Sequence, residues 1–292
     1  MPSGTSAIVR SRYFRLFALS LLWVIVFRAP LSALGNLTLQ NEDYNYIVLI
    51  PVISVWLLIL ERRRIFNLPR YCPAVGLPLM LAGVLVYLSG ALLRGSESLS
   101  LAVLAFVLLW QGGFVLCCGP GTCRKAAFPL LFLLCIVPPP AFVLDQAIEA
   151  LRAGSTDVSY ALFRLAGVPV FRHGFFLTLP GAEIEVAKQC SGIRSSVSLL
   201  IAGLLAGHFF LQLNSRKMLL AVCIVPIMIL KNAVRIVAIA LLGVYWDHSF
   251  FFGSFHHQYG GLAVSALAVA MLVPVIWMLR KSEPSDHLAA EK

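Results

Sequence analysis

The chain has 292 residues, of which 60% are hydrophobic and only 12% are charged. Soluble domains carry about 25% charged residues, so this composition excludes an ordinary water-soluble protein and indicates a membrane protein. The formal net charge of +10 does not indicate nucleic-acid binding, because the basic residues fall in short clusters between apolar runs. We therefore expect one integral membrane domain over residues 1–292, with no sizeable soluble domain.

Eight apolar stretches are candidates to cross a bilayer, for which about 20 mostly apolar residues are needed. The second stretch, residues 46–60, is short, so its helix must extend beyond these limits or thin the bilayer locally. The first lacks a small-residue cleavage site, which indicates a retained anchor rather than a signal peptide. The sequence thus predicts an all-α membrane protein with an eight-helix transmembrane bundle. The stretches are residues 13–34, 46–60, 74–93, 99–118, 126–143, 190–213, 217–245 and 261–280.

The connectors between these spans alternate in charge. Besides the N-terminal tail, basic residues collect at residues 61–64, 124–125, 216–217 and 280–281. The intervening connectors, such as residues 41–43, are poorer in basic residues. Because basic connectors stay on the cytoplasmic side, the pattern predicts a multi-pass protein of the inner (plasma) membrane with both termini in the cytoplasm.

One outer connector, residues 144–189, is too long for a simple loop. Its first part, residues 144–165, mixes apolar and charged side chains and is a candidate interfacial amphipathic helix. From Val170 onwards, alternating β-branched and aromatic residues are separated by turn residues such as Pro180-Gly181. This pattern predicts a small extracytoplasmic β-meander that leads directly into Cys190.

Among seven cysteines, Cys190 alone is put at the outer surface by the predicted topology. It has no evident disulfide partner there, and an unpaired thiol in an oxidising compartment indicates reactivity. Cys190 opens the sixth span, where backbone N–H groups and the helix dipole favour the nucleophilic thiolate. Ser191 is a candidate cap for this helix, and Arg194, four residues on, would stabilise the thiolate. The alternative is a cysteine that packs as a small apolar residue at a helix end.

Lys231, Asn232 and Arg235 interrupt the otherwise apolar seventh span. A charge at membrane depth costs at least about 2.5–3.5 kcal/mol on insertion scales, so it usually has a partner or a task. Arg235 lies about 27 Å beyond Lys217 at 1.5 Å per residue, near the outer edge of a core about 30 Å thick. The alternative, snorkelling of Arg235 to the headgroups, explains a charge near the edge but not its clustering with Asn232.

The loop before the last span contains the adjacent histidines His256 and His257. A histidine that titrates near neutrality suits general acid–base chemistry beside a thiol. Adjacent residues do not face the same site on a helix, so we expect at most one of the two to act. The sequence has no HExxH motif and no third outer His or Cys at a suitable spacing, so we expect neither a metal nor another cofactor.

Three sequence blocks resemble the signature motifs of the exosortase/archaeosortase family. They are Ala187–Ser195 (AKQCSGIRS), Asn232–Ile236 (NAVRI), and Phe255-His256 with a glycine four residues after the histidine. The proline-rich stretch at residues 137–140 and the β-patterned approach to the cysteine also resemble this family. The likeness covers about residues 125–270, and the N-terminal half matches only as a hydrophobic multispan layout.

The resemblance implies a cysteine peptidase or transpeptidase in which Cys190 is the nucleophile, Arg235 the active-site arginine and His256 the catalytic histidine. His257 stays an alternative to His256, because Gly261 follows it at the same offset. The similarity to sortases would lie in the site and its chemistry, on an unrelated fold.

The resemblance also implies supporting roles and partners. Arg194, Ser191 and Asn232 would support the site. The family processes exported proteins that end in a short Pro-Glu-Pro-like tag, a hydrophobic helix that packs in membrane lipid, and a basic tail. It is thought to transfer them to a surface acceptor, here a glycan or a lipid. Two other functions stay open: a multispan transporter that uses the polar cluster of Arg235 and Asn232, and a membrane acyltransferase that uses a histidine.

Overall fold

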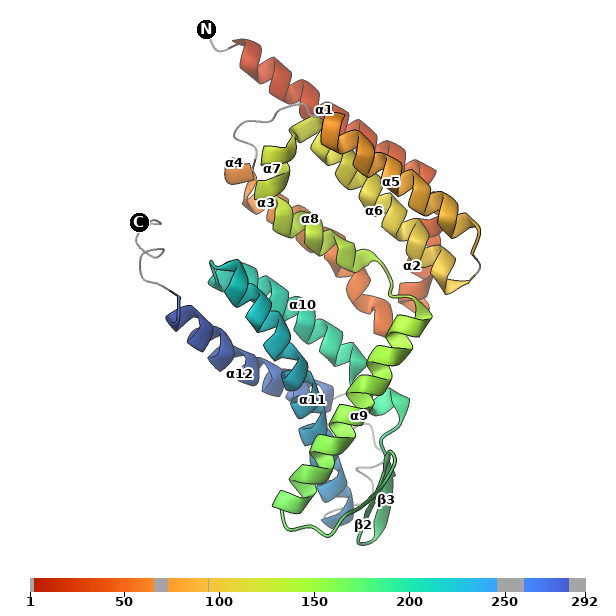
Figure 1. The fold of residues 1–292 in the computed structure, drawn as a ribbon, viewed down its shortest axis with the longest axis vertical. Coiled ribbons are helices and arrows are strands. Elements are labelled where there is room, and N and C mark those ends of the chain that lie inside the picture. Colours follow the sequence, from red (N-terminus) through yellow and green to blue (C-terminus); the bar gives the residue numbers. More distant parts are fainter. Residues whose placement is uncertain (1–2, 66–72, 94, 246–259, 284–292) are drawn as a thin grey trace. The chain divides into compact units, whose positions relative to one another are not determined.

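The computed structural model describes residues 3–65, 73–93, 95–245 and 260–283, and most of them are helical (Figure 1). The chain divides into two compact units, Met1–Val143 and Leu144–Lys292. All the described residues of the candidate site belong to the second unit.

The first unit is built from long apolar helices and short connecting helices. Helices α5 and α6 pack closely against each other, where four glycines, at residues 76, 83, 90 and 112, allow close approach of the two helices. A Cβ at Gly112 would lie 2.4 Å from Met80 Cγ, and a Cβ at Gly76 would lie 2.8 Å from Leu116 N. The elements are α1 (Ser3–Val26), α2 (Arg28–Gln40), the 3-10 helix η1 (Glu42–Val48), α3 (Leu49–Leu60), α4 (Arg62–Ile65), α5 (Pro73–Ala91), α6 (Ser96–Cys118), α7 (Pro120–Lys125), α8 (Ala127–Leu133) and the 3-10 helix η2 (Leu134–Ile136).

The second unit combines a long helix, a small sheet and a group of three helices. In this group α10, α11 and α12 pack against one another (Figure 1). The buried carboxylate of Glu283, just after α12, accepts hydrogen bonds from the backbone N–H groups of Gln212 and Leu213, each 3.0 Å long. The elements are α9 (Ala141–Leu165), β1 (Phe171–His173), β2 (Phe176–Leu179), β3 (Ala182–Glu185), the 3-10 helix η3 (Lys188–Ser191), α10 (Ile193–Phe210), α11 (Asn214–Tyr245) and α12 (Gly260–Lys281).

The three strands form the predicted meander, an antiparallel sheet in the order β1-β2-β3. In β2 the side chains alternate, and Leu177 and Leu179 point into a core that also contains Phe163 of α9 and Ile236 of α11. The sheet therefore rests on both helices, and β3 runs into the turn that carries Cys190. The predicted helix at residues 144–165 is confirmed as α9.

The predicted all-α membrane protein with a small sheet is confirmed, although two of the predicted spans are not continuous. The described residues contain six helices long and apolar enough to cross a membrane, or up to eight if two bent pairs each count as one span. The second predicted span extends beyond its predicted limits, as expected, to Glu42–Leu60. Within the predicted spans at residues 13–34 and 126–143, the helix is interrupted rather than continuous.

Prolines account for both interruptions. A helix that continued from α1 through Phe27 would bring the ring of Pro30 against the carbonyl of Val26, and the chain instead bends by 72° between Phe14–Val26 and Arg28–Gln40. In the other stretch η2 ends at Ile136, and α9 begins only after the three prolines at residues 138–140. These residues have no N–H group to donate to a helix.

Candidate active site

Cys190 lies on a tight turn just before α10. Its backbone N–H donates to the carbonyl of Ala187 at 2.9 Å within η3. The helix begins at Ile193, and its N-terminal cap is Gly192, which has a left-handed backbone (φ +70°). The prediction that Cys190 opens the helix is therefore wrong by three residues, and the thiol is carried by the turn.

Ser191 does not cap this helix, contrary to the prediction. No side chain makes a capping hydrogen bond at Gly192. Ser191 is fully buried, and its Oγ has no hydrogen-bond partner among the described residues. The reason is the local geometry, because the residue with the cap conformation is the glycine that follows Ser191. Arg194 is the second residue of α10 and is exposed. Because Cys190 lies before this helix, in η3, the two residues do not have the predicted i,i+4 relation on one helix.

Asn232 of α11 holds this turn in place. Its side-chain Nδ2 donates to the backbone carbonyl of Cys190 at 2.9 Å and to Ser155 Oγ of α9 at 3.0 Å. Asn232 is 2% exposed and Ser155 is fully buried, so both hydrogen bonds are shielded from water. Three chain segments therefore meet at one amide group, and the polar residue predicted at membrane depth has a defined partner at Cys190.

Gly192 is required by the same contact. A Cβ at this position would lie 2.7 Å from Asn232 Oδ1 and 2.9 Å from Asn232 Cγ. Its backbone is also in the left-handed region that side chains disfavour. The glycine after Cys190-Ser191 thus allows Asn232 to reach the carbonyl of Cys190.

Lys231 gives the turn a second link to α11, which the sequence interpretation missed. It is fully buried, and its Nζ donates a short hydrogen bond to Ser195 Oγ. Ser195 Oγ in turn donates to the carbonyl of Gly192 at 3.1 Å. The sequence feature that pointed to this link was the position of Lys231, directly before Asn232 in a span that is otherwise apolar.

Arg235 lies one helical turn beyond Asn232 on α11 and is partly buried. Its Nε is buried and has no hydrogen-bond partner among the described residues. No hydrogen bond or ion pair joins Arg235 to Cys190 in the part of the chain that is described, so their predicted meeting stays a prediction. The candidate histidines His256 and His257 lie in the segment 246–259, outside the described residues.

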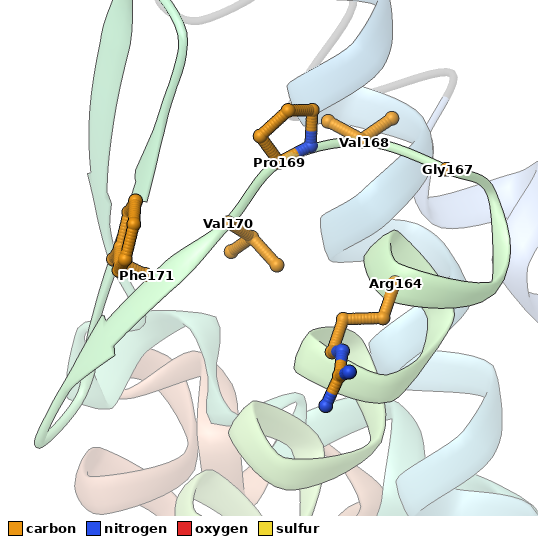
Figure 2. Close-up of a pocket in the computed structure, with 6 residues that line it drawn as sticks. All are labelled: Arg164, Gly167, Val168, Pro169, Val170 and Phe171. Atoms are coloured by element: carbon orange, nitrogen blue, oxygen red, sulfur yellow. The ribbon is translucent and has the colours of Figure 1, made fainter.

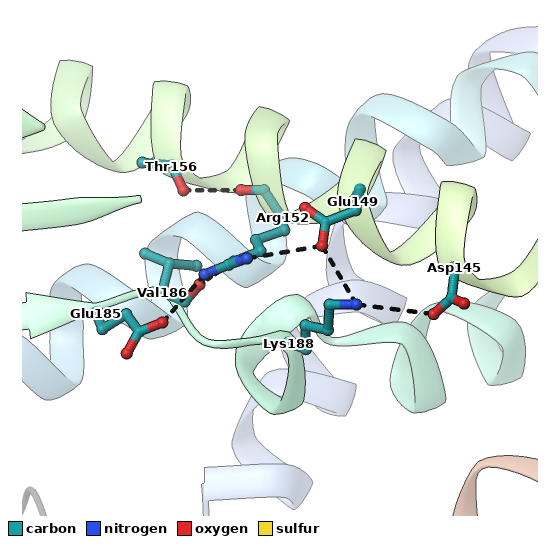
Figure 3. A network of polar contacts seen from close by, with 7 residues as sticks. All are labelled: Asp145, Glu149, Arg152, Thr156, Glu185, Val186 and Lys188. Carbon is teal, nitrogen blue, oxygen red and sulfur yellow. Dashed lines mark hydrogen bonds and ion pairs between the residues drawn. The ribbon is translucent and has the colours of Figure 1, made fainter. Parts of the chain in front are cut away.

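A network of charged side chains fixes the approach to Cys190 (Figure 3). The guanidinium of Arg152, on α9, donates to the carbonyl of Val186 and lies 3.8 Å from the centroid of the Phe175 ring. The same group forms ion pairs with Glu149 at 3.6 Å and Glu185 at 3.2 Å. Lys188, two residues before Cys190, pairs with Asp145 at 3.8 Å and with Glu149 at 3.7 Å. The network ties β3 and η3 to α9, and periodicity alone gave no sign of it.

A separate pocket lies where α9 connects to β1 (Figure 2). It has a volume of about 350 Å³ and is lined by Arg164 and by residues 167–171. Figure 2 shows Val170 and Arg164 on facing walls of this pocket. Within the described ranges, no three His, Cys, Asp or Glu side chains are grouped so that they could hold a metal ion.

The fold and these contacts define a class of protein: a multi-pass membrane protein with a buried polar site in which a cysteine turn is held by an intramembrane helix. The transmembrane exosortase family (Exosortase_EpsH) matches residues 36–274, and the chain belongs to this family. The match confirms the resemblance and reaches further towards the N-terminus than the predicted region 125–270. Membership indicates a membrane protein of the protein-sorting transpeptidase type. No curated protein and no solved structure matches the chain.

Proposed function

We propose that this exosortase is a membrane-embedded cysteine peptidase/transpeptidase that cleaves the C-terminal sorting signals of exported proteins at the outer membrane face. One observation carries the proposal. The amide of Asn232, in the second signature block, donates to the carbonyl of Cys190, in the first block, across 42 residues of sequence. This contact supports a single site that contains a thiol and is built from two of the blocks that resemble the family's signature motifs.

The charge pattern supports an extracytoplasmic position for Cys190. The cysteine turn precedes α10, and the basic connector at residues 216–217 lies near the other end of this helix. A helix of 18 residues spans about 27 Å at 1.5 Å per residue, close to the thickness of the hydrocarbon core. With basic connectors in the cytoplasm, the thiol faces the outside of the inner membrane and both termini face the cytoplasm.

The first half of the reaction forms an acyl-enzyme. The hydrophobic helix of the substrate packs in membrane lipid against the bundle and presents the peptide bond before it to Cys190. The Cys190 thiolate attacks the carbonyl carbon, and Arg235 stabilises the oxyanion that develops. His256 donates a proton to the leaving amine as the C–N bond breaks, which leaves a thioester on Cys190.

The second half transfers the acyl group. An amine or hydroxyl of a surface acceptor, a glycan or a lipid, attacks the thioester carbonyl, and His256 accepts its proton. The C–S bond breaks and the Cys190 thiolate is restored, whereas attack by water gives hydrolysis instead. Asn232 and Gly192 keep the thiol-bearing turn in place throughout. The β-meander forms one wall of the site and selects the tag.

The proposal is tested with a reporter protein that ends in a Pro-Glu-Pro-type tag, a hydrophobic helix and a basic tail. The reporter is co-produced with the wild-type chain or with Cys190→Ala or Cys190→Ser, and its cleavage is followed by mass. Both variants should accumulate in the membrane and leave the reporter uncut. Cys223→Ala is the matched control, because Cys223 is a free, partly buried cysteine on α11 and should allow full cleavage.

Cleavage by Cys190→Ala would refute the nucleophile, and a reporter left intact by the wild-type chain would refute the activity on this tag. An impermeant maleimide applied to intact spheroplasts tests the orientation separately. Labelling of a variant whose only cysteine is Cys190 is expected from the outside, and labelling only after the membrane is opened would contradict it.

A further inference from the structure

The pocket at the end of α9 has no task in the mechanism proposed above. Its volume of about 350 Å³ lies within the range of small-molecule sites, about 300–1,000 Å³. Among the described residues that line it, Arg164 alone carries a charge, and residues 167–171 supply mostly apolar walls. Figure 2 shows the Arg164 side chain opposite Val170 across this space. The pocket therefore combines one cation with an apolar surface.

Arg164 has no counter-charge in the part of the chain that is described. The other three lysine and arginine side chains of residues 144–190 all pair with carboxylates, whereas none pairs with Arg164. The three are Arg152, Arg172 and Lys188. The Arg164 guanidinium lies 5.9 Å from the centroid of the Tyr160 ring, near the outer limit of a cation–π contact. Its planar set of N–H donors is therefore suited to an anion that enters the pocket.

The end of α9 does not need Arg164 as a cap. The last carbonyls of a helix lack partners within the helix, and an arginine side chain often supplies one. Here the carbonyls of residues 162–164 already accept hydrogen bonds of 2.9–3.1 Å from the backbone N–H groups of residues 166–168. Gly167, with φ +73°, makes the turn that allows these bonds. Capping therefore does not account for the guanidinium at this position.

Two exposed apolar side chains adjoin the pocket. Leu165, directly after Arg164, is 83% exposed, and Phe171 on the pocket wall is 79% exposed. No other large apolar side chain described in the second unit is as exposed as these two. Exposed apolar surface beside a cation is typical of a site that meets a membrane or another amphipathic partner.

The packing of α9 on α11 indicates the depth of the pocket in the bilayer. Phe163, the residue before Arg164, lies in one core with Ile236 and Ala240 of α11. At 1.5 Å per residue these two positions are about 28 and 34 Å beyond Lys217 at the inner boundary. The hydrocarbon core is about 30 Å thick, and the bilayer with its headgroups about 40–45 Å. The end of α9 therefore lies level with the outer headgroups.

We propose that this pocket binds the headgroup of an anionic phospholipid from the outer leaflet. The Arg164 guanidinium contacts the phosphate, for which its planar fork is well suited, and the apolar part of the lipid covers Leu165 and Phe171. A zwitterionic headgroup fits less well, because it would bring a second cation close to Arg164. The bound lipid holds the end of α9, and with it the β-meander, at the membrane surface. Lipid binding here does not depend on the peptidase activity.

The test uses the full-length chain in vesicles of phosphatidylethanolamine and phosphatidylglycerol. The probe is a trace of phosphatidylglycerol with a photoreactive diazirine on one acyl chain, and phosphatidylethanolamine with the same chain is the comparison. After irradiation, the labelled peptides are identified by mass spectrometry. Labelling of residues 160–175 should be at least fivefold stronger with the phosphatidylglycerol probe.

Arg164→Gln should remove this preference while labelling of α10, α11 and α12 stays unchanged, and Arg164→Lys should restore part of it. Arg172→Gln is the matched control and should keep the preference, because the guanidinium of Arg172 already pairs with Asp157. A second variant, Leu165→Gln/Phe171→Gln, should lower the labelling at least threefold. Both of its side chains are exposed, so its unfolding temperature should not change.

Equal labelling by the two lipids, or a preference that survives Arg164→Gln, would overturn the proposal. Sodium phosphate that abolishes the preference, compared with sodium chloride at equal ionic strength, would assign the site to a free anion and overturn the lipid. A pocket covered by a second copy of the chain would be labelled by neither probe, which would also overturn it.

Discussion

Replacement of Asn232 by alanine is the perturbation whose effect can be worked out most directly from the structure. The change removes two buried hydrogen bonds, one to the carbonyl of Cys190 and one to Ser155 Oγ. Each is worth about 0.5–1.5 kcal/mol net, and the groups left without a partner add to the cost because they are buried. We expect Asn232→Ala to lower the free energy of unfolding by about 2–4 kcal/mol, including the cavity left by the amide.

The same change should lower cleavage at least tenfold, because the turn that carries Cys190 loses its anchor to α11. The assay is reporter cleavage per folded molecule, with thermal unfolding of the detergent-purified protein as the second readout. Asn214→Ala is the matched control, since Asn214 is an exposed asparagine on the same helix and its loss should change neither value.

Gly192→Ala tests the same contact from the other side. The added Cβ would lie 2.7 Å from Asn232 Oδ1 in a left-handed backbone that costs alanine about 1–2 kcal/mol. We expect the losses of Gly192→Ala and Asn232→Ala to be non-additive in the double variant, because the second change removes the clash made by the first. Wild-type stability and cleavage in Asn232→Ala, or strictly additive losses, would refute the reasoning.

Three further predictions follow from other parts of the chain. Arg152→Met should speed proteolysis within the β-meander, because it removes the guanidinium that contacts both the Val186 carbonyl and Glu185. Arg152→Lys should not restore the wild-type rate, because lysine lacks the planar fork that makes both contacts at once. Equal proteolysis rates in the wild type and the variants would contradict this. Gly112→Ala should destabilise the protein by about 1–3 kcal/mol, since its Cβ would lie 2.4 Å from Met80 Cγ. The control is Gly35→Ala, whose Cβ meets nothing within 4 Å and which should be neutral or stabilising. A lower unfolding temperature for Gly35→Ala than for Gly112→Ala would count against the α5–α6 packing. Burial raises the pKa of the Cys123 thiol, so less thiolate forms at any given pH. The pH at which its alkylation rate is half-maximal should therefore lie above the corresponding pH for free cysteine. A half-maximal pH equal to or below that of free cysteine would disprove the prediction.

Much of the fold could be predicted from the sequence, because bilayer thickness sets span length and alternation marks strands. The meander after Val170 and the helix over residues 144–165 follow the predicted patterns, although α9 begins three residues earlier, at Ala141. The breaks at Phe27 and at residues 137–140 were missed for one reason. Hydropathy sums over a window and does not register prolines that end a helix inside an apolar run, whether one, as at Pro30, or three, as at residues 138–140.

The candidate site was predictable as a set of residue types but not as a set of contacts. Motif spacing brought Cys190 and Asn232 into one hypothesis, and the hydrogen bond between them supports it. The role of Gly192 and the Ser195–Lys231 link were not accessible, because they depend on how α10 packs against α11. Ser191 shows where residue preference alone misleads. Serine is a preferred N-cap residue, but the N-cap position here is the next residue, Gly192, and Ser191 is buried instead.

The most direct measurement of the central claim is the chemical identity of the intermediate. The purified enzyme is mixed with a cleavable reporter, quenched in acid within one turnover and analysed by mass spectrometry of its peptides. We predict a thioester between the reporter carbonyl and Cys190 that neutral hydroxylamine releases and that is absent in Cys190→Ala. An acyl group on any other residue, or cleavage without a hydroxylamine-sensitive adduct, would contradict the assignment of Cys190 as the nucleophile.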